Sequence, residues 1–214
     1  MAKQTIIYLH GFLSSTQGTK ATYFEQQIAT YPEVDFHAIK FNPTPRDFEF
    51  MTITGQINRL RQYVLDHQFE SVSLIGSSLG GQVALHYAYR YGGVDKLLLL
   101  APALFYSVNR YGPNELAQWQ ISGVHTLWHD GLQEDLPLRY QFHVDRLQYN
   151  QPIHPPAPTV IIHGRKDDVV PIIGSRQYAS ANPDNVTLIE VDSDHRLNDQ
   201  LLIIWEHVQT FLFG

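Results

Sequence analysis

Residues 74–83 read LIGSSLGGQV and place three glycines and two serines between an apolar run and a helix-like segment. The spacing is G-x-S-x-G, with Gly76 and Gly80 flanking Ser78, while Ser77 is the filler residue. A chain that turns sharply from a strand into a helix strains the central residue and exposes its hydroxyl, and only glycine fits at the flanking positions. This stretch therefore predicts a nucleophile elbow at Ser78. A glycine-rich turn with a capping serine is the alternative.

The composition of the chain predicts a folded globular domain. Its 214 residues are 43% hydrophobic and 17% charged, and its formal net charge is −6. Scattered Lys and Arg residues argue against a nucleic-acid surface. The absence of cysteine excludes disulfides and thiolate chemistry and fits a reducing compartment. The apolar run LLLLAPALFY is too short to cross a bilayer, and the amino terminus lacks a signal-peptide core, so we expect a cytoplasmic protein without membrane partners.

Short apolar segments alternate with helix-like segments along the chain. Several of the apolar segments are hydrophobic almost throughout, which is typical of strands covered on both faces of a parallel sheet. This order predicts an α/β, doubly wound fold. The expected strands are residues 5–9, 34–41, 71–75, 96–101, 159–163 and 186–191; the expected helices are 21–30, 54–67, 79–91, 175–181 and 199–213.

Residues 104–158 interrupt this alternation, because they are rich in aromatic residues and contain no clear strand. We expect a helical cap insertion within a single domain spanning residues 1–214, with a possible helix at 135–149. Insertions after the carboxyl end of a strand commonly cover the ligand crevice of such sheets. The aromatic rings could equally form a small core of the insertion itself.

A serine nucleophile needs a histidine base that is oriented by a carboxylate. Two loops that follow predicted strands contain these groups: GRKDDVVP after residues 159–163 and DSDHRL after residues 186–191. Both loops leave the sheet at the edge where Ser78 is expected. His195 is therefore the predicted base, and Asp167 or Asp168 the predicted acid. Asp167 could instead cap a helix, and His195 could be a surface residue.

These motifs, in this order, resemble those of the α/β-hydrolase superfamily, and the resemblance spans nearly the whole chain. The early YLHGFLSS, followed by TKA, and the GSSLGG turn resemble small bacterial YqiA-like esterases. The superfamily's acid loop commonly reads G-x-x-D-x-x-V-P, which implies Asp167 as the acid. Because His10-Gly11 comes so early, the resemblance also implies about six parallel strands, with the first two strands of the full fold missing.

The resemblance implies hydrolysis of carboxylic (short-chain acyl) esters or thioesters through an acyl-enzyme, without a cofactor or metal. The backbone amides of Phe12 and Leu79 would form the oxyanion hole. His125 and His129 have an i, i+4 spacing but lack the glutamate of a zinc motif. Other chemistry on the same triad (acyl transfer, lipase, peptidase or C–C hydrolase activity) and a non-catalytic binding module are the alternatives. The expected substrate-lining residues are Leu13, Leu104, Phe105, Tyr106, Trp119 and Trp128.

Overall fold

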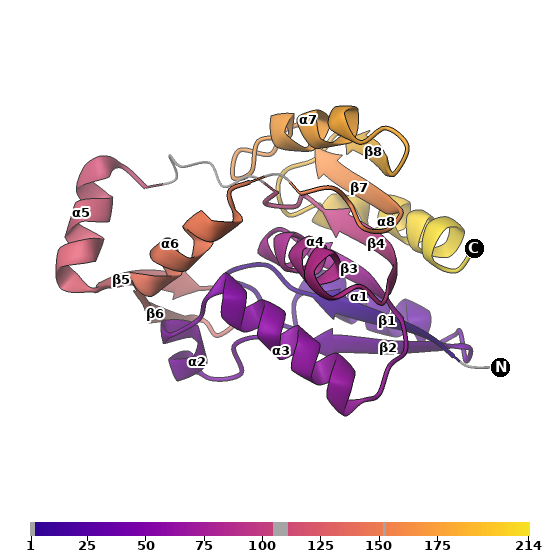
Figure 1. Ribbon diagram of the computed structural model, residues 1–214, viewed down its shortest axis with the longest axis horizontal. Coiled ribbons are helices and arrows are strands. Elements are labelled where there is room, and N and C mark those ends of the chain that lie inside the picture. The colour runs from indigo at the N-terminus through magenta and orange to yellow at the C-terminus, as the bar shows by residue number, and fades with distance from the viewer. Residues whose placement is uncertain (1–2, 105–110, 152) are drawn as a thin grey trace.

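The computed structural model describes residues 3–104, 111–151 and 153–214. Its centre is a six-stranded sheet in the order β2-β1-β3-β4-β7-β8, in which every neighbouring pair is parallel (Figure 1). The six predicted strands are therefore confirmed, with ends that shift by up to two residues. They are β1 (Gln4–Leu9), β2 (Val34–Ile39), β3 (Val72–Ser77), β4 (Val94–Leu100), β7 (Thr159–Gly164) and β8 (Val186–Val191).

Helices cover both faces of this sheet, as a doubly wound fold requires. One face packs against α1 (Thr19–Ile28), α8 (Leu201–His207) and the helical turn η3 (Val208–Leu212) that continues α8. The opposite face packs against α3 (Ile53–Asp66), α4 (Leu79–Tyr91) and α7 (Ile173–Ala181). A capping box between Thr44 and Asp47 starts the short helix α2 (Pro45–Glu49), which the sequence analysis did not predict.

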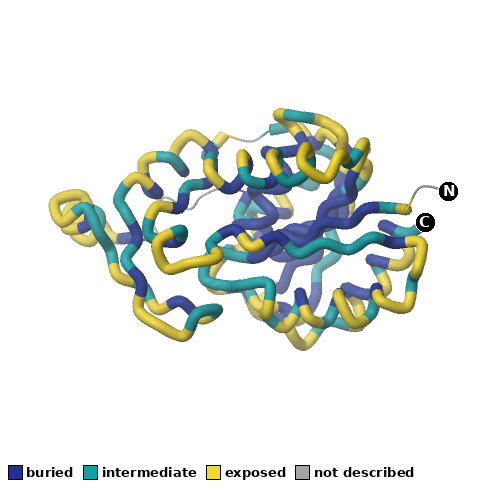
Figure 2. The backbone as a smooth tube through the Cα atoms, turned by 90° about the horizontal axis from the view of Figure 1, so that it is seen from below, coloured by how far each residue is buried: buried dark blue, intermediate teal, exposed yellow. Residues whose placement is uncertain are grey.

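The hydrophobic core has two halves because successive side chains of a strand point to opposite faces. In β1, Ile7 and Leu9 belong to the half beneath α3 and α4, whereas Ile6 and Tyr8 belong to the half beneath α1 and α8. The sheet is accordingly the most continuously buried part of the chain (Figure 2). This double burial explains why several strands are apolar over most of their length.

The segment between β4 and β7 projects to one side of the sheet (Figure 1). It contains α5 (Pro113–Ser122), an antiparallel hairpin of β5 (Val124–His129) and β6 (Glu134–Arg139), α6 (Gln141–Arg146) and the short turn η1 (Leu147–Tyr149). The insertion contains helices, as expected, but it also contains a hairpin where no strand was expected. The possible helix over 135–149 forms only in its second half, as α6 and η1. The insertion lies beside the carboxyl ends of the central strands, a position that suits a cap over a site at that edge.

The hairpin could not be predicted from the sequence, and the reason is physical. Only three of its twelve residues, namely Leu136, Leu138 and His129, are buried, so its apolar pattern is weak. Pro137 lies within β6, and proline usually argues against a strand. A two-stranded sheet consists only of edge strands, so it tolerates a proline that the central sheet would not. No helix in the described ranges combines the length and the apolar character needed to cross a membrane.

Candidate active site

The turn from β3 into α4 has the strained geometry that the G-x-S-x-G spacing predicts. Ser78 has φ +53° and ψ −116°, a region that non-glycine residues seldom occupy. It precedes the first residue of α4, Leu79, and its side chain is partly exposed, whereas Ser77 is buried. The turn therefore presents one serine hydroxyl to the outside and keeps the other within the sheet.

Two glycines make this turn possible by leaving space for backbone. A Cβ atom on Gly76 would lie 2.6 Å from the carbonyl oxygen of Gly80. A Cβ atom on Gly80 would lie 2.7 Å from the carbonyl oxygen of His10, at the end of β1. Both distances are shorter than real Cβ contacts, and the neighbouring atoms are backbone that cannot rotate away. Helix α4 can therefore begin close to the sheet only because these positions carry no side chain.

The loops after β7 and β8 bring Asp167 and His195 to this serine. The Nε2 atom of His195 lies 3.0 Å from Ser78 Oγ, and its Nδ1 atom lies 2.7 Å from Asp167 Oδ2. The structure thus brings the three predicted residues into one hydrogen-bonded chain, although 117 positions separate Ser78 from His195. Asp168 and Asp194, the neighbouring carboxylates, are both exposed. Asp194 accepts hydrogen bonds from the backbone of its own loop.

The Asp167 carboxylate is buried and receives several hydrogen bonds. Its Oδ1 atom accepts from the backbone amides of Val169 and Val170, at 3.0 and 2.7 Å, and its Oδ2 atom contacts His163 and His195. Burial alone would raise the pKa of this carboxyl group. The hydrogen bonds from His163, His195 and Val170 outweigh that effect and hold the pKa well below its usual range. Asp167 is therefore an anion at neutral pH.

His163 is a part of the site that the sequence analysis missed. Its Nε2 atom lies 3.0 Å from Asp167 Oδ2 and 2.9 Å from the carbonyl oxygen of Val170. A carbonyl can only accept, so Nε2 carries the proton. The Nδ1 atom of the same ring lies 2.8 Å from Ser175 Oγ on α7. The only available signal was a histidine ending a strand four residues before the acid, and among eleven histidines that spacing did not stand out.

His10 connects the loop after β1 to the segment that follows β2. Its Nδ1 atom lies 2.8 Å from the Gly11 carbonyl oxygen, and its Nε2 atom faces the Phe41 amide at 3.4 Å. Because a carbonyl only accepts and an amide N–H only donates, Nδ1 carries the proton and Nε2 accepts. The His10 ring is therefore neutral. Burial lowers the pKa of His10 to about 4, consistent with this state. The loop passes directly beside Ser78, since a Cβ on Gly11 would lie 3.4 Å from Ser78 Cβ.

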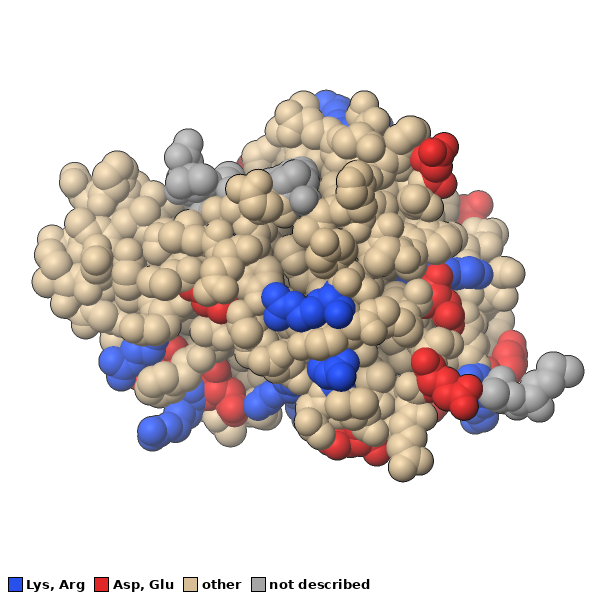
Figure 3. Space-filling view, viewed as in Figure 1, with Lys and Arg blue, Asp and Glu red and all other residues tan. Residues whose placement is uncertain are grey.

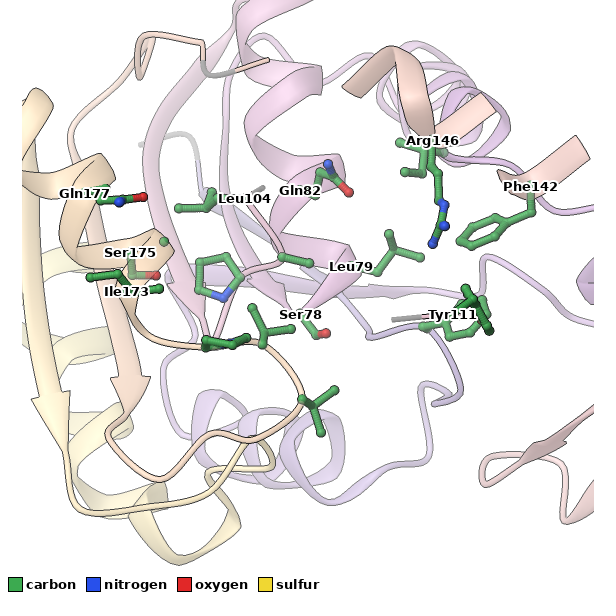
Figure 4. Close-up of a pocket in the computed structure, with 18 residues that line it drawn as sticks. Ser78, Leu79, Gln82, Leu104, Tyr111, Phe142, Arg146, Ile173, Ser175 and Gln177 are labelled. Carbon is green, nitrogen blue, oxygen red and sulfur yellow. The ribbon is translucent and has the colours of Figure 1, made fainter. Parts of the chain in front are cut away.

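A mostly apolar cavity of about 230 Å³ adjoins Ser78 (Figure 4). It lies between the sheet edge, α7 and the insertion, and its wall also includes Phe12 from the loop after β1 and Ile53 of α3. Its lining residues include Phe12, Leu79, Leu104, Phe142, Arg146 and Ser175. Phe12 also stacks on Phe142 of α6, with ring centroids 5.0 Å apart, so the loop after β1 and the insertion close one side together.

A second, more polar cavity of about 350 Å³ shares Ser78 and Phe12 with the first. Its wall includes Lys20, Asp130 and Arg196. Lys20 donates to the carbonyl oxygen of Arg196 at 2.6 Å, and burial lowers its pKa to about 8. Ser78 therefore lies where an apolar cavity and a polar cavity meet.

Only some of the predicted substrate-lining residues line a cavity in the structure. Leu104 lines the apolar cavity and Leu13 the polar one, while Phe105 and Tyr106 lie outside the described residues.

Trp119 and Trp128 line neither cavity in the described parts of the chain, so these two predictions are wrong. Trp119 is buried within the insertion and donates to the Leu138 carbonyl oxygen at 2.9 Å, whereas Trp128 is half exposed on β5. Trp119 thus packs within the insertion, whereas Tyr111 and Phe142 of the same segment line the apolar cavity. His125 and His129 lie on β5, and the described ranges contain no cluster of three metal-binding side chains.

The parallel six-stranded sheet and the serine turn at its carboxyl edge define the α/β-hydrolase fold. Solved structures of other proteins share it, among them the following two. One is Est1E from Butyrivibrio proteoclasticus with ferulic acid bound, which is 17% identical with a TM-score of 0.79 and covers 99% of this chain and 89% of that one. The other is mouse alpha/beta hydrolase domain-containing protein 10, which is 25% identical with a TM-score of 0.76 and coverages of 96% and 88%.

Residues 5–211 match the model of an uncharacterised protein family, UPF0227, and the chain belongs to that family. Among curated proteins it is similar to the mitochondrial palmitoyl-protein thioesterase ABHD10. The Bos taurus protein is 26% identical over 216 residues, covering 91% of this chain and 68% of that protein. The Homo sapiens protein is 27% identical over 208 residues, with the same coverages.

Proposed function

We propose that this protein is a serine hydrolase that cleaves carboxylic esters or thioesters of short acyl groups through an acyl-enzyme intermediate. The observation that carries the proposal is the continuous contact from Ser78 Oγ through His195 to Asp167 beside an apolar cavity. The strained backbone of Ser78 supports the same role, because strain is retained where function requires an exposed nucleophile.

The hydrogen-bond partners of His195 determine which of its two ring nitrogens carries the proton. Asp167 is an anion and can only accept, so His195 Nδ1 carries a proton and Nε2 presents a lone pair to the Ser78 hydroxyl. His195 takes the proton of Ser78 as Oγ attacks the acyl carbon, and it then protonates the departing alcohol or thiol. Water, deprotonated by the same ring, releases the acid from Ser78.

The backbone amides of Leu79 and Phe12 are proposed to hold the oxyanion. Leu79 is the first residue of α4, where an amide has no acceptor within the helix and the helix dipole favours negative charge. Phe12 belongs to the loop that passes beside Ser78. Two such donors stabilise the tetrahedral state by several kcal/mol.

The two cavities beside Ser78 suggest where the acyl group and the leaving group of the substrate would bind. The acyl group would occupy the apolar cavity, and the alcohol or thiol would leave through the polar one. The apolar cavity is smaller than the roughly 300–1,000 Å³ of pockets that hold drug-sized ligands, which favours a short acyl group. The mammalian relatives are described as palmitoyl-protein thioesterases, so thioesters belong in the substrate panel beside oxygen esters.

The expected partner is a small molecule. On the face shown in Figure 3, basic side chains are interspersed with acidic ones and form no continuous basic patch. A cytoplasmic location stays a prediction, as the ABHD10 relatives are described as mitochondrial.

The test is turnover of 4-nitrophenyl butyrate by paired serine variants. Ser78→Ala should lower kcat by at least about 10⁴-fold, because the nucleophile is lost. Ser77→Ala should stay within about threefold of the wild type, because this buried hydroxyl does not contact His195 in the described contacts. Circular dichroism should show both variants folded. Turnover retained by Ser78→Ala contradicts the proposal.

A further inference from the structure

Among the described residues that line the apolar cavity, one side chain is charged, Arg146 at the end of α6. Arg146 is only 1% exposed, although arginine is rarely buried to this extent. Figure 4 shows its guanidinium nitrogens between Leu79 and Phe142. Leu79 follows the proposed nucleophile directly, so this cation faces the same space that the acyl group would enter.

The guanidinium of Arg146 is held by its neighbours. Its Nη2 atom lies 2.6 Å from His143 Nδ1, one helical turn earlier, and its Cζ atom lies 5.3 Å from the centroid of the Tyr111 ring. Arginine can only donate, so His143 Nδ1 accepts and the imidazole is neutral. Burial, followed by the charge of Arg146, lowers the pKa of His143 in agreement. These contacts fix the orientation of the cation before any ligand arrives.

The rest of the cavity wall carries no opposing charge. Its other described lining residues are apolar or neutral, and none is Asp or Glu. The residues outside the described ranges, 1–2, 105–110 and 152, include no acidic residue either. A carboxylate entering the cavity would therefore meet a cation and no anion. The planar fork of a guanidinium matches a carboxylate, and low polarity strengthens their attraction.

We propose that Arg146 selects acyl groups that end in a carboxylate, so that the substrates are monoesters or monothioesters of dicarboxylic acids. This inference rests on the proposed function. The ester carbonyl would lie at Ser78, the methylene chain along Leu79 and Phe142, and the far carboxylate on Arg146. The bond cleaved is the ester bond: the alcohol leaves with a proton, the acyl group forms an ester with Ser78, and water releases the dicarboxylate.

The test compares two esters with acyl chains of the same length, mono-4-nitrophenyl adipate and 4-nitrophenyl hexanoate. The measured quantity is the ratio of their kcat/KM values. A charge-assisted hydrogen bond at the far end should favour the adipate monoester by about 10- to 100-fold in the wild type. Arg146→Met should bring the ratio to about one or below, and Arg146→Lys should give an intermediate ratio.

The matched control is Arg176→Met. Arg176 is on α7 between cavity-lining residues, but it points outward to Glu190, and its removal should leave the ratio unchanged. A wild-type ratio near or below one overturns the inference without any variant, and so does an Arg146→Met ratio equal to that of the wild type. Failure of the proposed function looks different: neither ester would be turned over, and Ser78 would not react with a fluorophosphonate.

Discussion

The Nε2 atom of His163 lies 3.0 Å from Asp167 Oδ2, the same oxygen that accepts the hydrogen bond from His195. The carboxylate is thus held from both sides. A second proton donor that fixes the acid also fixes the direction in which the acid orients its catalytic partner. His163 contacts no atom of Ser78 in the described hydrogen bonds, so we regard it as a positioning residue.

Removing the donor at His163 should slow catalysis without weakening substrate binding. We expect His163→Leu to lower kcat by about 10- to 100-fold, the cost typical of losing such a supporting contact, with little change in KM. His163→Gln retains an N–H group near the position of Nε2 and should recover most of the rate. Steady-state kinetics on 4-nitrophenyl butyrate separates these effects. Equal losses in the Leu and Gln variants would show that the ring merely fills space.

Neutralising the acid should have a much larger effect. Asp167→Asn removes the anion that holds Nδ1–H of His195 in place, and we expect kcat to fall by about 10⁴-fold. Asp168→Asn is the matched control, because this adjacent carboxylate is exposed and should be dispensable. If kcat depends on Asp168 and not on Asp167, the assignment of the acid is wrong.

The close approach of α4 to β1 predicts different outcomes for two Gly→Ala substitutions. Gly80→Ala forces a methyl group against the His10 carbonyl oxygen and should lower the free energy of unfolding by about 2–3 kcal/mol. Gly112→Ala places its methyl group in open space at a negative φ and should be neutral within about 0.5 kcal/mol. Urea denaturation measures both. A neutral Gly80→Ala would mean that the turn is less tightly packed than described.

A buried histidine outside the site should make the fold sensitive to acid. Burial, reinforced by the charge of Arg90, lowers the pKa of His86 to about 4, against about 6.5 for an unfolded chain. Between these values the unfolded state binds more protons, so stability is complete above about pH 6.5 and declines as the pH falls toward 4.

The contribution of His86 to this decline should be on the order of 2–3 kcal/mol. His86→Phe should therefore flatten the pH dependence of the unfolding free energy between pH 7 and 4.5. His154→Phe, which alters an exposed histidine, should leave the slope as it is in the wild type. An unchanged slope in His86→Phe would show that this ring is not kept neutral by burial. His10 shares the lowered pKa and should account for part of the remaining slope.

The sequence predicted the sheet well because both of its faces are covered. The central strands are apolar over most of their length, and the G-x-S-x-G turn has strict steric needs that only a few residue types meet. The loops bearing Asp167 and His195 could be placed because parallel strands deliver their following loops to one edge. Chain order and strand position were therefore sufficient to bring distant residues together.

The insertion and the inner part of the site could not be predicted in the same way. The hairpin β5–β6 has few buried residues and contains Pro137, so its pattern is weak. Trp119 and Trp128 belong to one aromatic-rich segment, and only tertiary packing decides that neither faces the cavity. The proposed roles of His163 and Arg146 also depend on contacts with residues distant in the sequence, Ser175 and Tyr111, and local spacing does not reveal these contacts.

The most direct measurement of the central claim is the site of a covalent fluorophosphonate adduct. Only a serine activated by a neighbouring base reacts rapidly with this reagent. Mass spectrometry of the digested protein should find one adduct, on Ser78, and Asp167→Asn should slow its formation. A protein that stays unmodified, or an adduct on Ser77 or another serine with Ser78 intact, would contradict the account.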